Sequence, residues 1–264
     1  MSEPSVQDLF NLSGRVALVT GASGHLGKSL AVALAELGAS VVVASRDRKR
    51  GEESAATLPA RGSSRHHAVV IDYCNEASIT AGFADAVAVA GQVDVLVNNG
   101  HDSNASDLTD VSAEQFNRML SNATGYFLLS RMFRDHVVDR SSTGSIVMLG
   151  SMYGVVGSYP AAYDGVCPAS PVHYHALKGG IVHMTRHLAV YWAENGIRVN
   201  CLSPGPFPGP AAPEEMVERL IDRSPMRRMG RPHELKGAVA LLASDAGSYL
   251  TGQNLLVDGG WTAW

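Results

Sequence analysis

The sequence predicts an α/β fold, a doubly wound parallel sheet of about seven strands with helices on both faces. The first observation is that short Val-rich runs alternate with longer segments in which Ala and Leu recur at helical spacing. The second is that each Val-rich run is apolar on both faces, as strands of a buried parallel sheet are, so the intervening helices act as crossovers. The third is a Gly-rich turn behind the first run, where a βαβ unit begins.

The elements follow one another without a repeat or a linker. The expected strands are the runs RVALVT, SVVVAS, HHAVVID, VDVLVNN, GSIVML, IRVNCLS and NLLVDGG. The expected helices cover residues 26–37, 48–57, 77–90, 113–136, 172–195 and 233–243. The last of them lies behind Pro232, which suits a first helical turn. A chain of 264 residues with this order is expected to be one domain, residues 1–264.

The composition narrows the classes of partner. The net charge is -4 and the pI is near 6.2, which does not give the basic surface of a nucleic-acid-binding protein. Cys74, Cys167 and Cys201 show no C-x-x-C spacing, so we expect no disulfide framework, no zinc site and no other metal. No apolar stretch is long enough to span a membrane, and the first residues lack a signal-peptide pattern. We therefore expect a cytoplasmic protein that binds a small molecule.

The stretch VTGASGHLGKS looks like a phosphate-binding turn. The P-loop of a nucleoside triphosphatase has four residues between its glycines, whereas five separate Gly21 from Gly27, and Leu26 stands at the glycine position. A dinucleotide turn needs a glycine bend after a strand and a helix N-terminus aimed at the pyrophosphate, which Thr20 and the three glycines can provide. Any tight strand-to-helix connection favours glycine, so this signal alone is modest.

Tyr174 and Lys178 lie four residues apart in an expected helix, so their side chains share one face. An ammonium group beside a phenol favours the phenolate. Lys178 is therefore expected to lower the pKa of Tyr174 toward the range in which a phenol acts as an acid or a base. The same spacing also occurs on the surface of ordinary amphipathic helices.

Further motifs stand in order around this pair: TGASGHLG, Asp72, NNG, SNATGYF, GSIVMLGS, IRVNCLSPG and VDGGW. With these motifs the chain resembles the short-chain dehydrogenase/reductase family over nearly its whole length. The resemblance implies a Rossmann-type sheet that binds NAD(P)(H). It also implies hydride transfer between the nicotinamide and a substrate carbon, without a metal.

The resemblance implies a catalytic set made of Asn122, Ser151, Tyr174 and Lys178. Tyr174 is the general acid in reduction and the general base in oxidation. Ser151 hydrogen-bonds the reacting oxygen, and Lys178 also binds the hydroxyls of the nicotinamide ribose. Asn122 holds a water molecule that links Lys178 to solvent. The ordinary alternative for Ser151 and Asn122 is capping or backbone hydrogen bonding.

For the cofactor, the resemblance implies contacts along the carboxyl edge of the sheet. They comprise Thr20, Gly21, Ser23, Gly24, His25, Leu26, Gly27, Ser45, Arg46, Asp72, Tyr73, Asn99, Gly100, Tyr174, Lys178, Pro204, Gly205 and Phe207. The last three lie in a Pro/Gly-rich segment behind the sixth strand, which is expected to be an active-site loop.

The end of the second strand decides between the two cofactors. An acidic residue there would favour NAD(H), but Ser45 and Arg46 occupy it, and a guanidinium suits a 2′-phosphate. NADP(H) is therefore favoured. NAD(H) is the alternative, because Arg46 could also belong to a solvated helix start beside Asp47.

Two positions depart from the compact members of the family. His25 replaces the middle glycine of the turn, and the spacing T-G-x-x-G-x-x-G that results is that of longer epimerases and dehydratases. A length of 264 residues leaves no room for their substrate domain, which favours the compact branch. His101 takes the place of a glycine after Gly100, where it would touch the substrate or cap the next loop.

The interval between Ser151 and Tyr174 is 23 residues, longer than is usual in the family. The extra residues, within 152–173, are expected to bulge beside the substrate. Their rings and hydrogen-bonding groups suit a polyhydroxylated molecule better than a long acyl chain, and they come from Tyr153, Tyr159, Tyr163, Asp164 and His173. A surface loop without such a role is equally open.

Three functions remain open. The first is an NAD(P)-dependent oxidoreductase that interconverts a secondary alcohol and a ketone of a sugar, sugar acid or polyol, as in gluconate-type dehydrogenases. The second is a β-ketoacyl carrier-protein reductase, for which five arginines between residues 219 and 231 could form a docking face. The third is a non-catalytic nucleotide sensor, against which the intact catalytic set argues. A homotetramer or dimer is expected, with Trp261 and Trp264 at a subunit contact.

Overall fold

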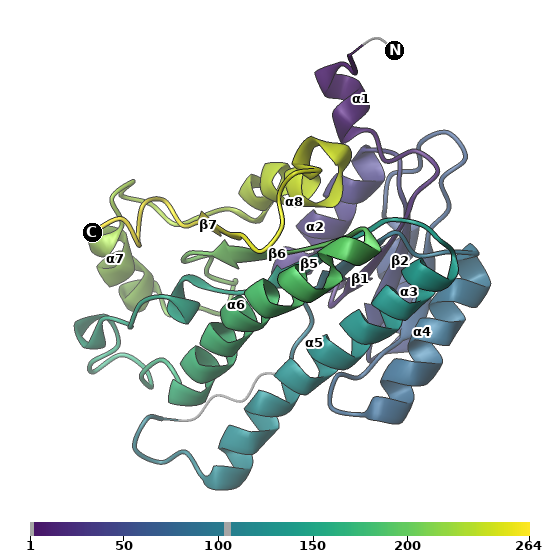
Figure 1. Ribbon diagram of the computed structural model, residues 1–264. Coiled ribbons are helices and arrows are strands. Elements are labelled where there is room, and N and C mark those ends of the chain that lie inside the picture. Colours follow the sequence, from purple (N-terminus) through teal and green to yellow (C-terminus); the bar gives the residue numbers. More distant parts are fainter. Residues whose placement is uncertain (1–2, 103–106) are drawn as a thin grey trace.

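A parallel sheet forms the centre of the protein (Figure 1). The computed structural model describes residues 3–102 and 107–264, and in this part of the chain seven strands pair in the order β3-β2-β1-β4-β5-β6-β7. All neighbouring strands are parallel. The strands are β1 (Val16–Thr20), β2 (Ser40–Ser45), β3 (His67–Val70), β4 (Val95–Asn98), β5 (Gly144–Leu149), β6 (Ile197–Pro204) and β7 (Asn254–Val257). The order confirms the predicted Rossmann-type fold, because the chain reverses its direction of winding between β1 and β4.

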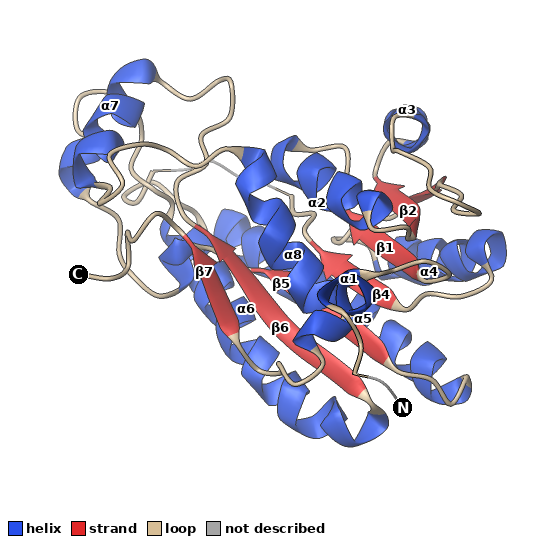
Figure 2. Ribbon diagram, turned by 90° about the horizontal axis from the view of Figure 1, so that it is seen from above, coloured by secondary structure: helices blue, strands red, loops and turns tan. Residues whose placement is uncertain are grey.

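Helices cover both faces of the sheet (Figure 2). Those on one face are α4 (Glu76–Ala90), α5 (Ala113–Asp139) and α6 (Val172–Trp192). Those on the other are α2 (His25–Glu36), α3 (Arg48–Ala56) and α8 (Lys236–Ala243). Within the described residues, no helix is both long enough and apolar enough to cross a membrane.

The predicted helices end within three residues of the observed ones, but two observed helices were not predicted. The first is α1 (Val6–Phe10), a short helix that begins with a capping box between Ser5 and Asp8. The second is α7 (Glu214–Arg223), whose arginines look in the sequence like a charged surface run. The start of α8 was also wrong, because a 3-10 turn covers Pro232–Leu235.

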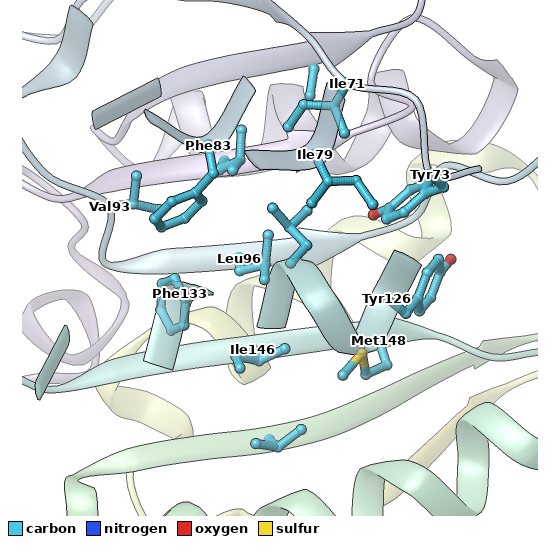
Figure 3. Packing of buried hydrophobic residues seen from close by; sticks show 14 of the residues in the cluster. Ile71, Tyr73, Ile79, Phe83, Val93, Leu96, Tyr126, Phe133, Ile146 and Met148 are labelled. Atoms are coloured by element: carbon cyan, nitrogen blue, oxygen red, sulfur yellow. The ribbon is translucent and has the colours of Figure 1, made fainter. Parts of the chain in front are cut away.

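Each strand contributes side chains to two apolar cores, one on either face of the sheet. On one face Leu96 packs with Phe133 of α5 and Ile146 of β5. Figure 3 shows this core, including the residues that α4 adds to it. On the other face Val97 packs with Leu34 of α2. Because both faces are buried, the strands are apolar along their whole length, which is the pattern that the sequence displays.

A third apolar cluster lies outside these layers. It joins Tyr163 of the segment 152–173 to Leu220 of α7 and to Trp261 near the C-terminus. Figure 1 shows α7 and the C-terminus together at the edge of the molecule beyond β7. The prediction that Trp261 lies at a subunit contact was wrong, because its ring is 2% exposed and packs 5.4 Å from Tyr159 of the same chain. Trp264 is 73% exposed.

Candidate active site

The turn between β1 and α2 is fixed by close backbone packing. Gly21 adopts a φ of +61°, and a Cβ there would lie 2.7 Å from Gly100 Cα. A Cβ on Gly27 would collide with the carbonyl oxygen of Gly21. The N-terminal peptide N–H groups of α2 have no partners within a helix and therefore suit a pyrophosphate. His25, the first residue of α2, is exposed and lines the same space.

A buried hydrogen-bond network holds the NNG segment against this turn. Thr20 Oγ1 accepts from the backbone N–H of Asn99 at 2.9 Å and of Gly100 at 3.1 Å. The Asn99 amide donates back to the carbonyl oxygens of Thr20 and Gly21, at 3.0 and 3.2 Å. The Tyr73 hydroxyl lies 2.6 Å from Thr20 Oγ1 and donates to Asn98, so this predicted cofactor contact is available through its ring and not its hydroxyl.

A cleft of about 410 Å³ opens at the carboxyl ends of β1, β2 and β4. Its lining includes most of the predicted cofactor residues, namely Thr20, Gly21, Ser23, Gly24, His25, Leu26, Gly27, Ser45, Arg46, Asp72, Tyr73, Asn99 and Gly100. It also includes residues that were not predicted, namely Ala44, Asp47, Arg50, Ile71 and Asp102, together with His101. The glycine turn and the volume fit a dinucleotide.

Arg50 shows why some of these residues were missed. It lies in α3, one turn behind the strand end that usually carries the signal, and its guanidinium donates to the Ser23 carbonyl oxygen at 3.2 Å. The alternative of a purely solvated helix start does not hold for Arg50, because its side chain reaches from α3 to the glycine turn.

The predicted catalytic residues come from three neighbouring elements. Ser151 follows β5 and is buried, Tyr174 and Lys178 lie on α6, and Asn122 lies in the middle of α5. Ser151 and Tyr174 share a side-chain hydrogen bond. Lys178 Nζ donates to the Leu149 carbonyl oxygen at 2.7 Å and lies 5.6 Å from the centre of the Tyr174 ring. The structure thus brings Ser151, Tyr174 and Lys178 together.

The expectation that Lys178 lowers the pKa of Tyr174 was wrong. Burial raises the pKa of Tyr174, and the hydrogen bond from Ser151 offsets only part of this effect. Burial also lowers the pKa of Lys178 to about 8. Desolvation therefore outweighs the attraction that the helical spacing suggested, since both side chains lose water when α6 packs on the sheet.

Asn122 is fully buried and binds the loop behind β4. Its Oδ1 accepts from the Asp102 N–H at 2.7 Å, and its Nδ2 donates to the carbonyl oxygens of Asp102 and Met119 at 3.2 and 2.9 Å. These contacts place His101 so that its ring centre lies 6.2 Å from that of Tyr174. The water-holding role of Asn122 stays a prediction.

The predicted contacts at the end of β6 are not among the residues that line this cleft. The Gly205 N–H donates to the Val257 carbonyl oxygen at 3.0 Å, and a Cβ on Gly205 would meet Asp258 Cα at 2.5 Å. The Phe207 ring packs closely against Gly230 and lines a second cavity of about 250 Å³. The position of the Phe207 ring is therefore fixed by its contact with Gly230.

The segment 152–173 is a packed wall and not a loose surface loop. The hydroxyls of Tyr153 and Tyr163 lie 2.7 Å apart, and the Tyr153 ring stacks on His175 at 4.6 Å. The Ser170 hydroxyl lies 3.0 Å from His175 Nε2. Arg219 of α7 donates to two backbone carbonyl oxygens of the segment, at 2.9 and 2.7 Å.

Two side chains of this segment differ from the expectation that they face a substrate. Asp164 is exposed, and its carbonyl oxygen is one of the two acceptors of Arg219. His173 is 0% exposed, with its ring 6.2 Å from that of Phe116 in α5. Tyr153 and Tyr163 interact electrostatically with Tyr174: Tyr163 raises the pKa of Tyr174, and Tyr174 raises the pKa of Tyr153.

The comparisons with known proteins agree with this geometry. The family model described as enoyl-(acyl carrier protein) reductase matches residues 21–262. A solved short-chain type dehydrogenase/reductase from Mycobacterium marinum superposes with a TM-score of 0.87 at 32% identity, covering 99% of this chain and 100% of that one. The chain belongs to the short-chain dehydrogenase/reductase family. As a short-chain dehydrogenase/reductase, it is an NAD(P)-dependent enzyme that interconverts a secondary alcohol and a ketone.

Several relatives within the family are dehydrogenases of small polar molecules. Galactitol 2-dehydrogenase (L-tagatose-forming) of Cereibacter sphaeroides is 35% identical over 97% of this chain and 98% of its own length. Gluconate 5-dehydrogenase of Gluconobacter oxydans is 33% identical over 99% of both chains. A solved gluconate 5-dehydrogenase from Burkholderia cenocepacia, in complex with NADP and tartrate, has a TM-score of 0.87 at 28% identity and covers 98% of this chain and 100% of its own. Because each match covers nearly the whole of both chains, these relatives are close to this chain in length, as expected for the compact branch.

Proposed function

We propose that this enzyme interconverts a secondary alcohol and a ketone of a sugar, sugar acid or polyol, and that it uses NADP(H) in preference to NAD(H). The observation that carries the proposal is the set of polar side chains in the wall of residues 152–173. Tyr153 pairs with Tyr163, and Ser170 pairs with His175 of α6, the residue after Tyr174. Polar rings and hydroxyl groups of this kind suit a substrate with several hydroxyls. The galactitol and gluconate dehydrogenases among the relatives support the same class of substrate.

The proposed chemistry uses Tyr174 and Ser151 at the reacting oxygen. In reduction the Tyr174 phenol donates a proton to the carbonyl oxygen, while Ser151 hydrogen-bonds that oxygen as negative charge develops. In oxidation Tyr174 removes the proton from the alcohol. The bound nicotinamide supplies or accepts the hydride. Because burial raises the pKa of Tyr174, kcat/KM for oxidation is expected to rise with pH while the phenol loses its proton.

The proposed cofactor preference rests on the end of β2. Ser45 and Arg46 line the cleft there, and Arg50 lines it from α3. Two guanidinium groups and a hydroxyl suit a 2′-phosphate better than a free 2′-hydroxyl. The gluconate 5-dehydrogenase complex with NADP supports this preference. A preference for NAD(H) in kcat/KM that survives Arg46→Ala would contradict it.

A substrate screen tests the proposal directly. Ketoses, keto sugar acids and β-ketoacyl thioesters are offered with NADPH, and the absorbance of NADPH is followed. We expect turnover of polyhydroxylated ketones and little with acyl ketones. The variant Tyr163→Phe is expected to raise KM for the best substrate severalfold and to leave the Kd of NADPH unchanged, because it removes one hydroxyl from the wall. Unchanged KM in this variant would contradict the role of the wall.

The arginines of α7 and the following segment give little support to carrier-protein binding. Arg219 is bonded to Glu215 and to the segment 152–173, and Arg223 lies 5.1 Å from the Tyr159 ring. Arg228 makes an ion pair with Glu234 at 2.6 Å. Arginines that already make ion pairs or hydrogen bonds within the chain contribute little to a docking face for an acidic partner.

We also propose that residues 1–264 act as one domain that assembles as a homotetramer or dimer in the cytoplasm. Val190 and Tyr191 of α6 are 75% and 68% exposed, and such side chains are often covered by another subunit. All three cysteines are free thiols, which fits a reducing compartment. Light scattering tests the assembly, and a monomer at assay concentration would contradict it.

A further inference from the structure

An ion pair crosses the cleft between two strands. Arg46, directly behind β2, donates from Nη1 to Asp102 Oδ1 at 2.8 Å. Asp102 lies behind β4, and both residues line the cleft. Because β2 and β4 flank β1 in the sheet, the pair spans the carboxyl end of β1 and the glycine turn attached to it. A bound cofactor therefore meets this pair.

Asp102 is the anchored member of the pair. Its side chain is 13% exposed, whereas that of Arg46 is 60% exposed. Its Oδ2 accepts from Arg118 Nε at 2.8 Å and lies 2.7 Å from Nη2 of the same guanidinium. Its backbone is held by the fully buried Asn122 of α5. The carboxylate thus keeps its place, and Arg46 is the side chain that can move.

The two oxygens of this carboxylate serve different arginines. Oδ1 binds Arg46 and Oδ2 binds Arg118. When Arg46 turns away, Asp102 is still paired with Arg118, so a largely buried carboxylate is not left without a counter-charge. Arg46 can therefore exchange Asp102 for another anion at a small cost.

We propose that Asp102 sets the selectivity between NADP(H) and NAD(H) by competing with the 2′-phosphate for Arg46. The inference rests on the proposed function, in which the adenosine ribose lies beside Ser45 and Arg46. A 2′-phosphate draws the guanidinium of Arg46 away from Asp102 into a bidentate contact. With a 2′-hydroxyl the ion pair stays closed over the ribose. Asp102 therefore weakens the binding of NADP(H) and leaves the binding of NAD(H) unchanged.

Fragments of the cofactor test this without turnover. 2′,5′-ADP and 5′-AMP carry the adenosine end with and without the 2′-phosphate, and isothermal titration gives their Kd values. Asp102→Asn removes the charge and keeps the backbone bonds to Asn122. We expect the Kd of 2′,5′-ADP to fall about twofold to fivefold, as for the loss of a partly exposed competing ion pair, while that of 5′-AMP stays unchanged.

Asp47→Asn is the matched control. Asp47 lines the same cleft, but its carboxylate caps α3 by accepting from the Arg50 N–H at 2.9 Å. This variant measures how far the Kd of 2′,5′-ADP falls when any nearby negative charge is removed. An equal fall in the two variants overturns the proposal. In an Arg46→Ala background, Asp102→Asn should leave both Kd values unchanged, and a gain that persists there overturns it as well.

Arg118→Gln provides a second measurement that does not depend on the folding of an Asp102 variant. The Arg118 side chain is 65% exposed, and without it Asp102 pairs with Arg46 alone. The Kd of 2′,5′-ADP should then rise severalfold with that of 5′-AMP unchanged, and a Kd of 2′,5′-ADP that stays or falls overturns the proposal. The unsubstituted enzyme tests the cofactor preference separately, because equal Kd values of the two fragments would contradict NADP(H) preference without bearing on the shift in Asp102→Asn.

Discussion

The cofactor half and the substrate half of the site are built from different parts of the chain. In the cofactor half the backbone itself makes the surface, and Gly21 and Gly27 are needed because any side chain there would collide with it. In the substrate half, Tyr163, Leu220 and Trp261 meet from three distant segments and pack through their side chains. A backbone surface restricts residue type strictly, whereas a side-chain wall can be made from many apolar combinations. The two halves should therefore respond separately to substitution.

Tyr174 lies where the two halves meet, and its loss should have the largest effect. Tyr174→Phe removes the proton donor and acceptor, so kcat/KM should fall about 10³-fold, within the usual range for an acid or base. The Kd of NADPH should change far less than kcat/KM, because the aromatic ring is kept and only the hydroxyl is lost. Steady-state kinetics and titration of NADPH fluorescence measure the two quantities. A parallel loss of NADPH binding would show that the halves are not separate.

The two C-terminal tryptophans provide a matched pair in the substrate half. Trp261→Ala should lower the free energy of unfolding by about 3 kcal/mol or more, since it leaves a cavity in the third apolar cluster. Trp264→Ala should change it by less than about 0.5 kcal/mol, because that ring is 73% exposed. Urea denaturation measures both.

The same Trp261 variant also separates the halves. In folded Trp261→Ala we expect KM for the substrate to rise severalfold and the Kd of NADPH to stay unchanged. Equal changes in both constants would contradict a substrate wall that packs independently of the cofactor turn.

Gly27→Ala should give the opposite result in the cofactor half. The added Cβ collides with the Gly21 carbonyl oxygen, so the turn must shift, at a cost of about 1 to 3 kcal/mol in the free energy of unfolding. The Kd of NADPH should rise about tenfold or more, while substrate KM at saturating cofactor stays near its original value.

Gly180→Ala is the control for this substitution. Gly180 lies in α6, and apart from its chain neighbours and the backbone of its own helix no described atom comes within 4 Å of a Cβ placed on it. It should be neutral or stabilising by up to about 1 kcal/mol, since alanine is the better helix former. Similar losses in the two variants would mean that the collision at Gly27 is not the cause.

A pH-dependent effect on stability concerns Lys178. Burial lowers the pKa of Lys178 from 10.5 to about 8. Between these values the unfolded chain binds a proton at this lysine that the folded chain does not, so stability rises with pH over that window. The free energy of unfolding of the original protein, relative to that of Lys178→Met, should rise from pH 8 by at most about 1.4 kcal/mol per pH unit. Parallel pH profiles of the two proteins would contradict a buried, depressed Lys178.

The cofactor half could be predicted from the sequence because its signals are local. The alternation of apolar strands with helices gave the sheet, and the glycine spacing gave the turn that lines the cleft. Contacts made by side chains from a following element were not visible in this way. Arg50 belongs to this group, because it reaches the cleft from α3. Asp102 lies just behind the NNG motif, but its pairing with Arg46 depends on the neighbouring strand β2, which no local pattern reveals.

For the substrate half, the sequence predicted which residue types lie near the substrate but not how they pack. The rings of Tyr153 and Tyr163 were expected near the substrate, but their mutual contact and their packing against α7 depend on a helix that the sequence did not reveal. Trp261 was misplaced for the same reason, because its partner Tyr159 lies about a hundred residues earlier and no periodicity links them. The pKa of Tyr174 was misjudged because spacing gives the neighbour of a group but not its loss of water.

Arg219 donates hydrogen bonds to the main-chain carbonyl oxygens of Ala161 and Asp164 in the segment 152–173. The side chains of these two residues take no part in the bonds. Main-chain acceptors are present whatever amino acid occupies a position. Substitutions within the segment 152–173 therefore leave these two hydrogen bonds to Arg219 available. Descendants of this protein can exchange residues along the segment, and so acquire new substrates, without first having to evolve a new way of fastening it to the enzyme.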